Sequence, residues 1–371
     1  MSLKLYPKLI LDTLENVRYP GTSQDIVTAG MVEDDIRIDG NKVSFSIRFP
    51  KHNDPFAKSV IKAAESTLET FISPDIEIKG NIQALFPEPK APEKAPILPD
   101  VKNIIAVSSG KGGVGKSTVT ANLAVALAMQ GYKVGLLDAD IFGPSVPKMF
   151  RCEDARPLLA DVDGRELIEP VERYGVKLLS IGFFVNPEDP ILWRGAMATN
   201  ALSQLITHGN WGELDFLLLD LPPGTSDIHL TLIQTLGITG AVIVTTPQEV
   251  ALADARKGVN MFLDPKVNVP VLGVVENMAW FTPAELPENK YYIFGKDGGK
   301  RLAEEMNTFL LAQIPLVQSV REAGDSGEPI AHNLETIMGL AFHQLANNVV
   351  ERTSVRNQTI APTQKVEVTH K

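Results

Sequence analysis

The stretch GKGGVGKST, residues 110–118, fits the pattern GxxxxGK[ST] of a phosphate-binding loop. Its glycines let the backbone bend so that successive N–H groups point at phosphate oxygens. Lys116 would bring a positive charge to the β- and γ-phosphates, and Ser117 would offer its hydroxyl to Mg²⁺. We therefore expect ATP and Mg²⁺ to bind here, with a cofactor-binding loop made of Gly110, Lys111, Gly112, Gly113, Val114, Gly115, Lys116, Ser117 and Thr118.

The segments around this loop predict the fold. An apolar strand at 104–108 precedes it and an amphipathic helix at 116–130 follows it. Further along the chain, buried apolar runs alternate with helical patterns, which indicates a parallel sheet covered by helices on both faces. The predicted fold class is α/β, a P-loop NTPase with a mostly parallel sheet. The expected strands are 104–108, 134–138, 176–180, 216–220, 241–245, 271–276 and 310–314, and the expected helices are 116–130, 197–208, 227–236, 250–263 and 335–352.

A proline-rich segment divides the chain. Residues 87–100 read PEPKAPEKAPILPD and contain five prolines, a composition typical of a semi-rigid linker. We expect a small α+β domain at 1–86, a linker at 87–101, the P-loop domain at 102–352 and a disordered tail at 353–371. Within the small domain the predicted helices are 3–17 and 56–71, and the predicted strands are 26–32, 35–39, 42–49 and 75–82.

Composition excludes several classes of protein. The net charge of −10 disfavours non-specific nucleic-acid binding, which depends on a basic face. The sequence contains no apolar run long enough to span a membrane, and its C-terminal end has no amphipathic basic pattern, so stable membrane association is not expected. A single cysteine, Cys152, excludes an internal disulfide. These features favour a cytoplasmic protein.

The second residue of the loop indicates a particular kind of P-loop. GKGGVGKST, with Lys111 in second place, resembles the deviant Walker A loop of the family that contains septum-site regulators, plasmid-partition ATPases and the nitrogenase iron protein. The resemblance implies a homodimer in which Lys111 reaches the nucleotide of the partner subunit and stabilises transition-state charge there. It also implies that Asp140 positions the attacking water and that Asp220 holds magnesium through water. Gly224, in the following switch loop, would sense the γ-phosphate.

Longer stretches resemble one branch of this family, the Mrp/ApbC iron–sulfur cluster carriers. They are DADIFGPS at 138–145, WRG at 193–195, LDLPPGTSD at 219–227, ENM at 276–278 and IFG at 293–295. Residues 1–86 resemble the small iron–sulfur assembly domain that precedes the ATPase in many members. The resemblance implies that Asn277 reads the adenine base, with Pro315 and its neighbours lining the same pocket. It also implies that the partners are apo iron–sulfur client proteins or scaffold proteins.

One feature departs from that branch. Cluster-carrying members usually have Cys-x-x-Cys between the Asn-Met and Phe-Gly elements, whereas residues 280–288 read WFTPAELPE. Because thiolates are the usual cluster ligands, the residues that would hold a cluster are unknown. We expect an ATP-hydrolysing iron–sulfur cluster carrier or assembly factor that matures apo-proteins. The alternatives are a partition- or positioning-type ATPase and an ATP-dependent adaptor without a bound cluster.

Overall fold

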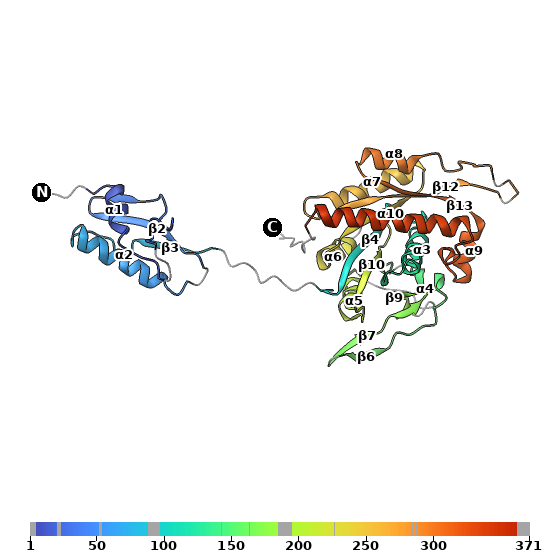
Figure 1. Cartoon of the computed structure of the whole chain (residues 1–371), viewed down its shortest axis with the longest axis horizontal. Coiled ribbons are helices and arrows are strands. Elements are labelled where there is room, and N and C mark those ends of the chain that lie inside the picture. Colours follow the sequence, from blue (N-terminus) through green and yellow to red (C-terminus); the bar gives the residue numbers. More distant parts are fainter. Residues whose placement is uncertain are drawn as a thin grey trace. The chain divides into compact units, whose positions relative to one another are not determined.

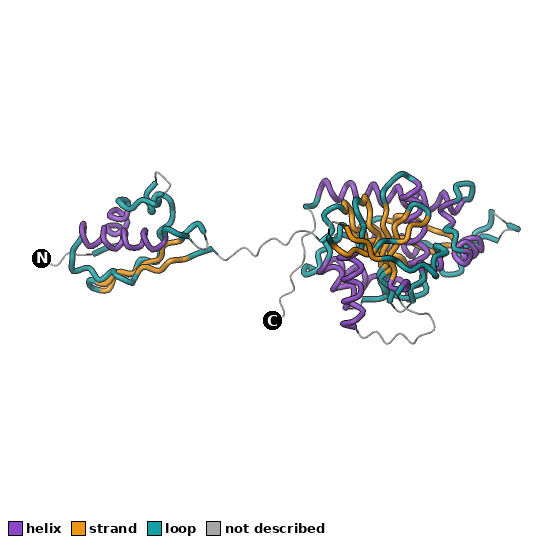
Figure 2. Tube along the Cα trace, turned by 90° about the horizontal axis from the view of Figure 1, so that it is seen from below, coloured by secondary structure: helices purple, strands orange, loops and turns teal. Residues whose placement is uncertain are grey.

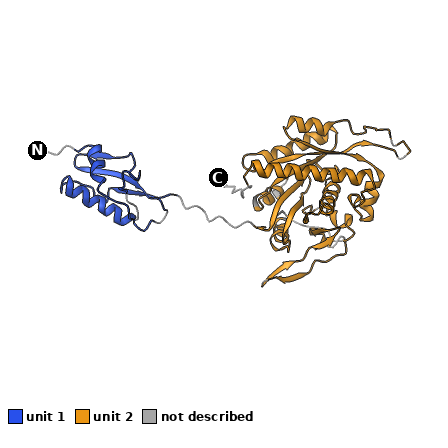
Figure 3. Ribbon diagram, in the orientation of Figure 1, with its two compact units in different colours: residues 1–94 blue, residues 95–371 orange. Residues whose placement is uncertain are grey.

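The computed structural model describes residues 5–20, 24–51, 54–87, 97–141, 143–162, 164–184, 195–225, 227–283, 285–286 and 288–361. The chain forms two compact units, 1–94 and 95–371 (Figure 3). The division between them falls inside the proline-rich segment, of which residues 88–96 lie outside the described residues.

In the N-terminal unit two helices cover one face of a small sheet (Figure 2). β1 and β2 form an antiparallel hairpin around Gly40-Asn41, and β3 pairs with β2 in parallel. Alternate residues of β2, Val43, Phe45 and Ile47, are buried against the helices, which is the pattern of a strand with one covered face. The small α+β domain is thus observed. Its elements are α1 (Pro7–Leu14), β1 (Arg37–Asp39), β2 (Lys42–Arg48), α2 (Ala57–Phe71) and β3 (Ile82–Leu85).

Two strand predictions in this unit are wrong. Residues 26–30 form a turn, because Asp25 Oδ1 accepts the backbone N–H groups of Val27 and Thr28 at 2.9 and 2.7 Å. The strand expected over 75–82 begins only at Ile82, after a turn in which Gly80 has a φ of 77°. In both places local turn chemistry prevails over the apolar content.

The second unit is built on an eight-stranded sheet (Figure 1). The strand order is β13-β12-β11-β4-β10-β5-β9-β8. Its strands run parallel from β13 to β9, and the edge strand β8 is antiparallel to β9. A separate hairpin, β6 with β7, precedes β8. The strands are β4 (Val101–Ser108), β5 (Val134–Asp138), β6 (Leu159–Val162), β7 (Arg165–Ile168), β8 (Val171–Arg173), β9 (Val176–Ser180), β10 (Leu214–Asp220), β11 (Gly240–Thr245), β12 (Val271–Phe281) and β13 (Leu310–Leu316).

Helices cover both faces of this sheet, as the sequence predicts. Neighbouring residues of β4 point to opposite sides: Ile105 and Val107 pack with α3, α4 and α10, whereas Ile104 and Ala106 pack with α5, α6, α7 and α8. The helices are α3 (Lys116–Met129), α4 (Val146–Met149), η1 (Ile181–Phe183), α5 (Gly195–His208), α6 (Asp227–Thr235), α7 (Glu249–Leu263), α8 (Gly298–Glu305), α9 (Gln318–Ser326), η2 (Ile330–His332) and α10 (Ile337–Thr359). Across the described part of the chain, none of them is both long and apolar enough to traverse a bilayer.

The last helix is longer than predicted. We expected a disordered tail from residue 353, but α10 continues to Thr359. Thr353 and Arg356 lie on the same face as the buried Val349 and are only 2% and 6% exposed. The Arg356 guanidinium also donates to the Ala361 carbonyl at 3.0 Å. The folded part of the P-loop domain therefore extends beyond 352, and residues 362–371 lie outside the described residues.

Candidate functional site

The predicted phosphate-binding loop connects β4 to α3. Gly113 and Gly115 have φ angles of 82° and 81°, a left-handed conformation that favours glycine. Gly110 is needed for a different reason, because a Cβ atom there would lie 2.1 Å from the carbonyl carbon of Asp254 on α7. The loop is thus shaped by its own backbone at two positions and by a neighbouring helix at a third.

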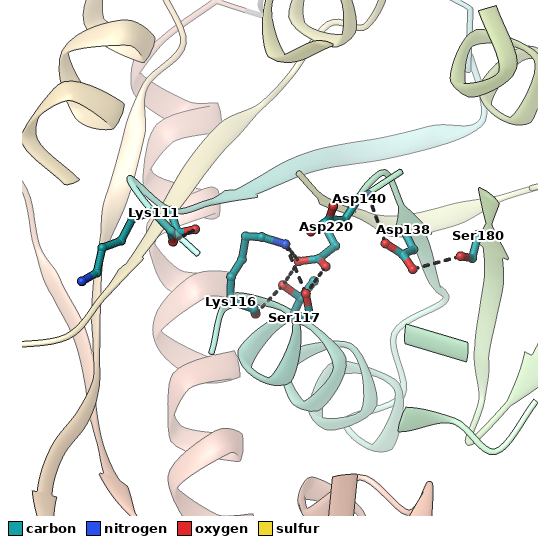
Figure 4. A network of polar contacts seen from close by, with 9 residues as sticks. Lys111, Lys116, Ser117, Asp138, Asp140, Ser180 and Asp220 are labelled. Carbon is teal, nitrogen blue, oxygen red and sulfur yellow. Dashed lines mark hydrogen bonds and ion pairs between the residues drawn. The ribbon is translucent and has the colours of Figure 1, made fainter. Parts of the chain in front are cut away.

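Lys116, Ser117 and Asp220 meet at the start of α3. Lys116 Nζ lies 2.8 Å from Asp220 Oδ1, and Ser117 Oγ donates to Asp220 Oδ2 at 2.6 Å (Figure 4). The two charged side chains are 6% and 0% exposed, so the ammonium compensates a carboxylate that water does not reach. The structure therefore brings together the predicted P-loop lysine, hydroxyl and strand-end acid.

A second acid stands beside Asp220. β10 lies between β4 and β5, and its register sets Asp220 next to Asp138 at the end of β5. Asp138 is fully buried and accepts the Ser180 hydroxyl at 2.9 Å and the Asp140 N–H at 3.2 Å. Burial, and then the neighbouring charge of Asp220, raises the pKa of Asp138 to about 7.

The predicted water-positioning residue, Asp140, lies near the loop. It follows β5, is half-buried and lines a cavity of about 220 Å³ together with the loop residues and Pro223. Sequence reasoning selected Asp140 and gave no role to Asp138. The signal for Asp138 was its place at the end of an apolar strand, which predicts burial.

Lys111 is separate from this cluster within one chain. Its side chain is half-buried, and Figure 4 shows it pointing away from Lys116 and Asp220. Its backbone carbonyl accepts the Ser109 hydroxyl at 3.0 Å, which holds the loop but leaves the ammonium group outside the cluster.

The switch loop is joined to the phosphate loop through Gly224. Its N–H donates to the Ser109 carbonyl at 2.9 Å, and its φ of 85° again favours glycine. The amide that we expected to sense a phosphate thus has a backbone partner in this structure.

Asn277 and Pro315 line a larger cavity of about 400 Å³ that shares Gly115 and Thr118 with the phosphate loop. The Asn277 amide nitrogen donates to the Val114 carbonyl at 2.8 Å and so ties this cavity to the loop. Several further wall residues escaped sequence reasoning because they come from α4 and α9, which no motif marks. They are Lys148, Met149, Val320 and Arg321.

The cysteine content of the chain does not fit a bound iron–sulfur cluster. Cys152, the single cysteine, is 5% exposed within the core beside α3, and burial raises the pKa of its thiol to about 11. Among the described residues, no group of three or more His, Cys, Asp and Glu side chains is placed to hold a metal ion. The chain therefore presents no thiolate set for a cluster.

The fold and the site together define a P-loop NTPase. A glycine-rich loop connects the central parallel strand β4 to the helix α3, and Asp220 stands at the end of the neighbouring strand β10. Residues 100–350 match the family described as NUBPL iron-transfer P-loop NTPase, and the chain belongs to that family. Residues 8–78 match the family described as iron-sulfur cluster assembly protein.

Relatives agree with this assignment. The chain is 41% identical over 348 residues to the iron-sulfur cluster carrier protein of Synechocystis sp., covering 93% of this chain and 97% of that one. Among solved structures, a nucleotide-binding protein in complex with ADP from Archaeoglobus fulgidus is 38% identical, with a TM-score of 0.56 over 66% of this chain and 93% of that chain. The septum site-determining protein MinD of Pyrococcus horikoshii, complexed with Mg-ADP, is 26% identical, with a TM-score of 0.50 over 69% and 99%.

Proposed function

We propose that this protein is an ATP-hydrolysing iron–sulfur cluster carrier or assembly factor that matures apo-proteins. The observation that carries the proposal is the match to the Synechocystis carrier protein along nearly the whole of both chains, so that both units are shared. A positioning ATPase of the MinD kind would share the P-loop unit alone.

ATP would bind along the two adjoining cavities. Residues 110–118 would surround its phosphates, and the larger cavity, with Asn277 and Pro315, would take the adenine. Support for the base end comes from its composition: apolar side chains suit the faces of a purine ring, and an amide can both donate to and accept from its edge.

The residues at the loop also fit magnesium. Ser117 and Asp220 offer a hydroxyl and a carboxylate, which are the oxygen donors that Mg²⁺ prefers. Bound there, the ion would neutralise charge on the phosphate oxygens. Lys116 would exchange its ion pair with Asp220 for contacts to the phosphates, since one ammonium group cannot serve both fully.

For hydrolysis we propose a homodimer. Lys111 of each subunit would approach the nucleotide held by the other, and Asp140 would orient the attacking water. Two observations support this: Lys111 points away from its own cluster, and Asp140 borders the phosphate cavity. A cation supplied in trans would make turnover depend on subunit pairing.

In the proposed function, thiolates of this chain do not hold the cluster during its transfer, because Cys152 is buried and burial raises the pKa of its thiol to about 11. We place the cluster's ligands on the donor or the apo-protein and assign this chain the ATP-driven control of their encounter. The glutamates and aromatic residues of the 280–288 stretch, WFTPAELPE, are not assigned as ligands.

The test is the activation of an apo-enzyme that requires a [4Fe–4S] cluster, supplied with a cluster-loaded donor. Wild-type protein with ATP should accelerate activation, and Lys116→Ala should not. Anaerobic incubation of the protein with iron and sulfide should give the same absorption for wild type and Cys152→Ala. No acceleration by the wild type would contradict the function, and cluster binding lost in Cys152→Ala would restore a thiolate-held cluster.

A further inference from the structure

Thr120 is a buried hydroxyl that the motif does not include. It lies on α3 one turn after Lys116, is 0% exposed, and donates from Oγ1 to Asp220 Oδ1 at 2.7 Å. The same oxygen lies 2.9 Å from the Lys116 carbonyl. One hydroxyl has one proton, and the bond to the charged acceptor is the stronger of the two.

Asp220 is held by three donors in this structure. Oδ1 receives Lys116 Nζ and Thr120 Oγ1, and Oδ2 receives Ser117 Oγ. The carboxylate is fully buried, so its orientation depends on these protein groups and not on bulk water.

Two of the three donors have another task in the function proposed above. Lys116 would turn to the phosphates, and the Ser117 hydroxyl would turn to magnesium. Thr120 lies behind the loop on the helix and lines neither cavity, so a ligand would not draw it away.

We propose that Thr120 is the positioning residue for Asp220. By holding Oδ1 when Lys116 and Ser117 leave, it keeps Oδ2 directed at the position of the metal. This inference rests on the proposed nucleotide function and adds to it a residue that touches neither nucleotide nor metal.

The test compares nucleotide affinity with and without magnesium. The dissociation constant of a fluorescent ATP analogue is measured in excess MgCl₂ and in EDTA for wild type, Thr120→Val, Thr120→Ala and Thr120→Ser. Thr353→Val is the matched control, because Thr353 is also buried in a helix and donates to the carbonyl four residues earlier, far along α10.

With magnesium, Thr120→Val and Thr120→Ala should bind about tenfold more weakly, the loss of one hydrogen bond to a charged group. In EDTA their affinity should match the wild type. Thr120→Ser, which keeps the hydroxyl, and Thr353→Val should match the wild type in both conditions. Equal weakening in both conditions, or no weakening in either, would overturn the positioning role. A wild type that binds equally well with and without magnesium would instead refute the proposed metal site.

Discussion

Replacing Gly110 with alanine tests whether the phosphate loop is held by its contact with α7. The added methyl carbon would lie 2.1 Å from the carbonyl carbon of Asp254 and 2.4 Å from the amide nitrogen of Ala255. Ordinary contacts between carbon atoms are about 3.5 Å or longer, so loop and helix would have to separate by roughly 1.4 Å. Ala255 is 0% exposed and belongs to the core beneath α7, which resists that movement. We expect Gly110→Ala to lower the free energy of unfolding by about 3 kcal/mol, the upper part of the range for overpacking.

Thermal unfolding followed by tryptophan fluorescence measures this effect in the unit that contains the loop, residues 95–371. The three tryptophans, Trp193, Trp211 and Trp280, all belong to the unit 95–371. For a unit of this size, 1 kcal/mol corresponds to about 2–4 °C, so the midpoint should fall by about 6–12 °C. The control is Gly112→Ala, where the nearest atom to the added carbon is 4.0 Å away and little change is expected. If the two variants unfold at the same temperature, the steric reasoning is refuted.

Three other outcomes are expected. In the folded chain the pKa of Asp138 is raised to about 7, whereas in the unfolded chain the same carboxyl has the usual acidic pKa of an aspartate. Between these two values the folded chain holds a proton that the unfolded chain has released. The free energy of unfolding of the nucleotide-free protein should therefore fall across that window, by up to about 1.4 kcal/mol per pH unit, and urea titrations of Asp138→Asn should show a shallower decline. The Cys152 thiol, with a pKa of about 11, should resist a disulfide reagent at mildly alkaline pH and react after denaturation; rapid reaction of the native protein would show that it is accessible. Lys111→Ala should retain nucleotide binding but lose at least about tenfold in ATP turnover, and an unchanged rate would remove the trans role.

Much of the P-loop unit could be predicted because its signals are contiguous. The motif at residues 110–118 predicts a phosphate loop, and the apolar runs before and after it predict a strand and a helix. The alternation of strands and helices along the chain predicts a parallel sheet. Asn277 and Pro315 could be assigned to one pocket because long stretches resemble a known family, and the structure places both in the same cavity.

The remaining features depend on contacts that no short pattern contains. α9 was missed because it has no buried residue, and an apolar stripe is what reveals a helix in a sequence. The predicted end of α10 at residue 352 is too early because Arg356 is buried, whereas arginine is a residue type expected at the surface. Glycine is required at position 110 because the backbone of α7 lies against it. The hydrogen-bond acceptor of Thr120 is Asp220, which lies one hundred residues away on β10.

The difference in burial between α3 and α9 has a consequence for hydrogen exchange. α3 carries the phosphate loop and buries ten of its fourteen residues, whereas α9, which walls the larger cavity, buries none. Amides of α3 should exchange with deuterium only when the whole unit unfolds, and those of α9 should exchange through local opening. The end of the site formed by residues 110–118 is therefore the end that stays formed while the protein fluctuates, and the end bordered by α9 is where the site opens first.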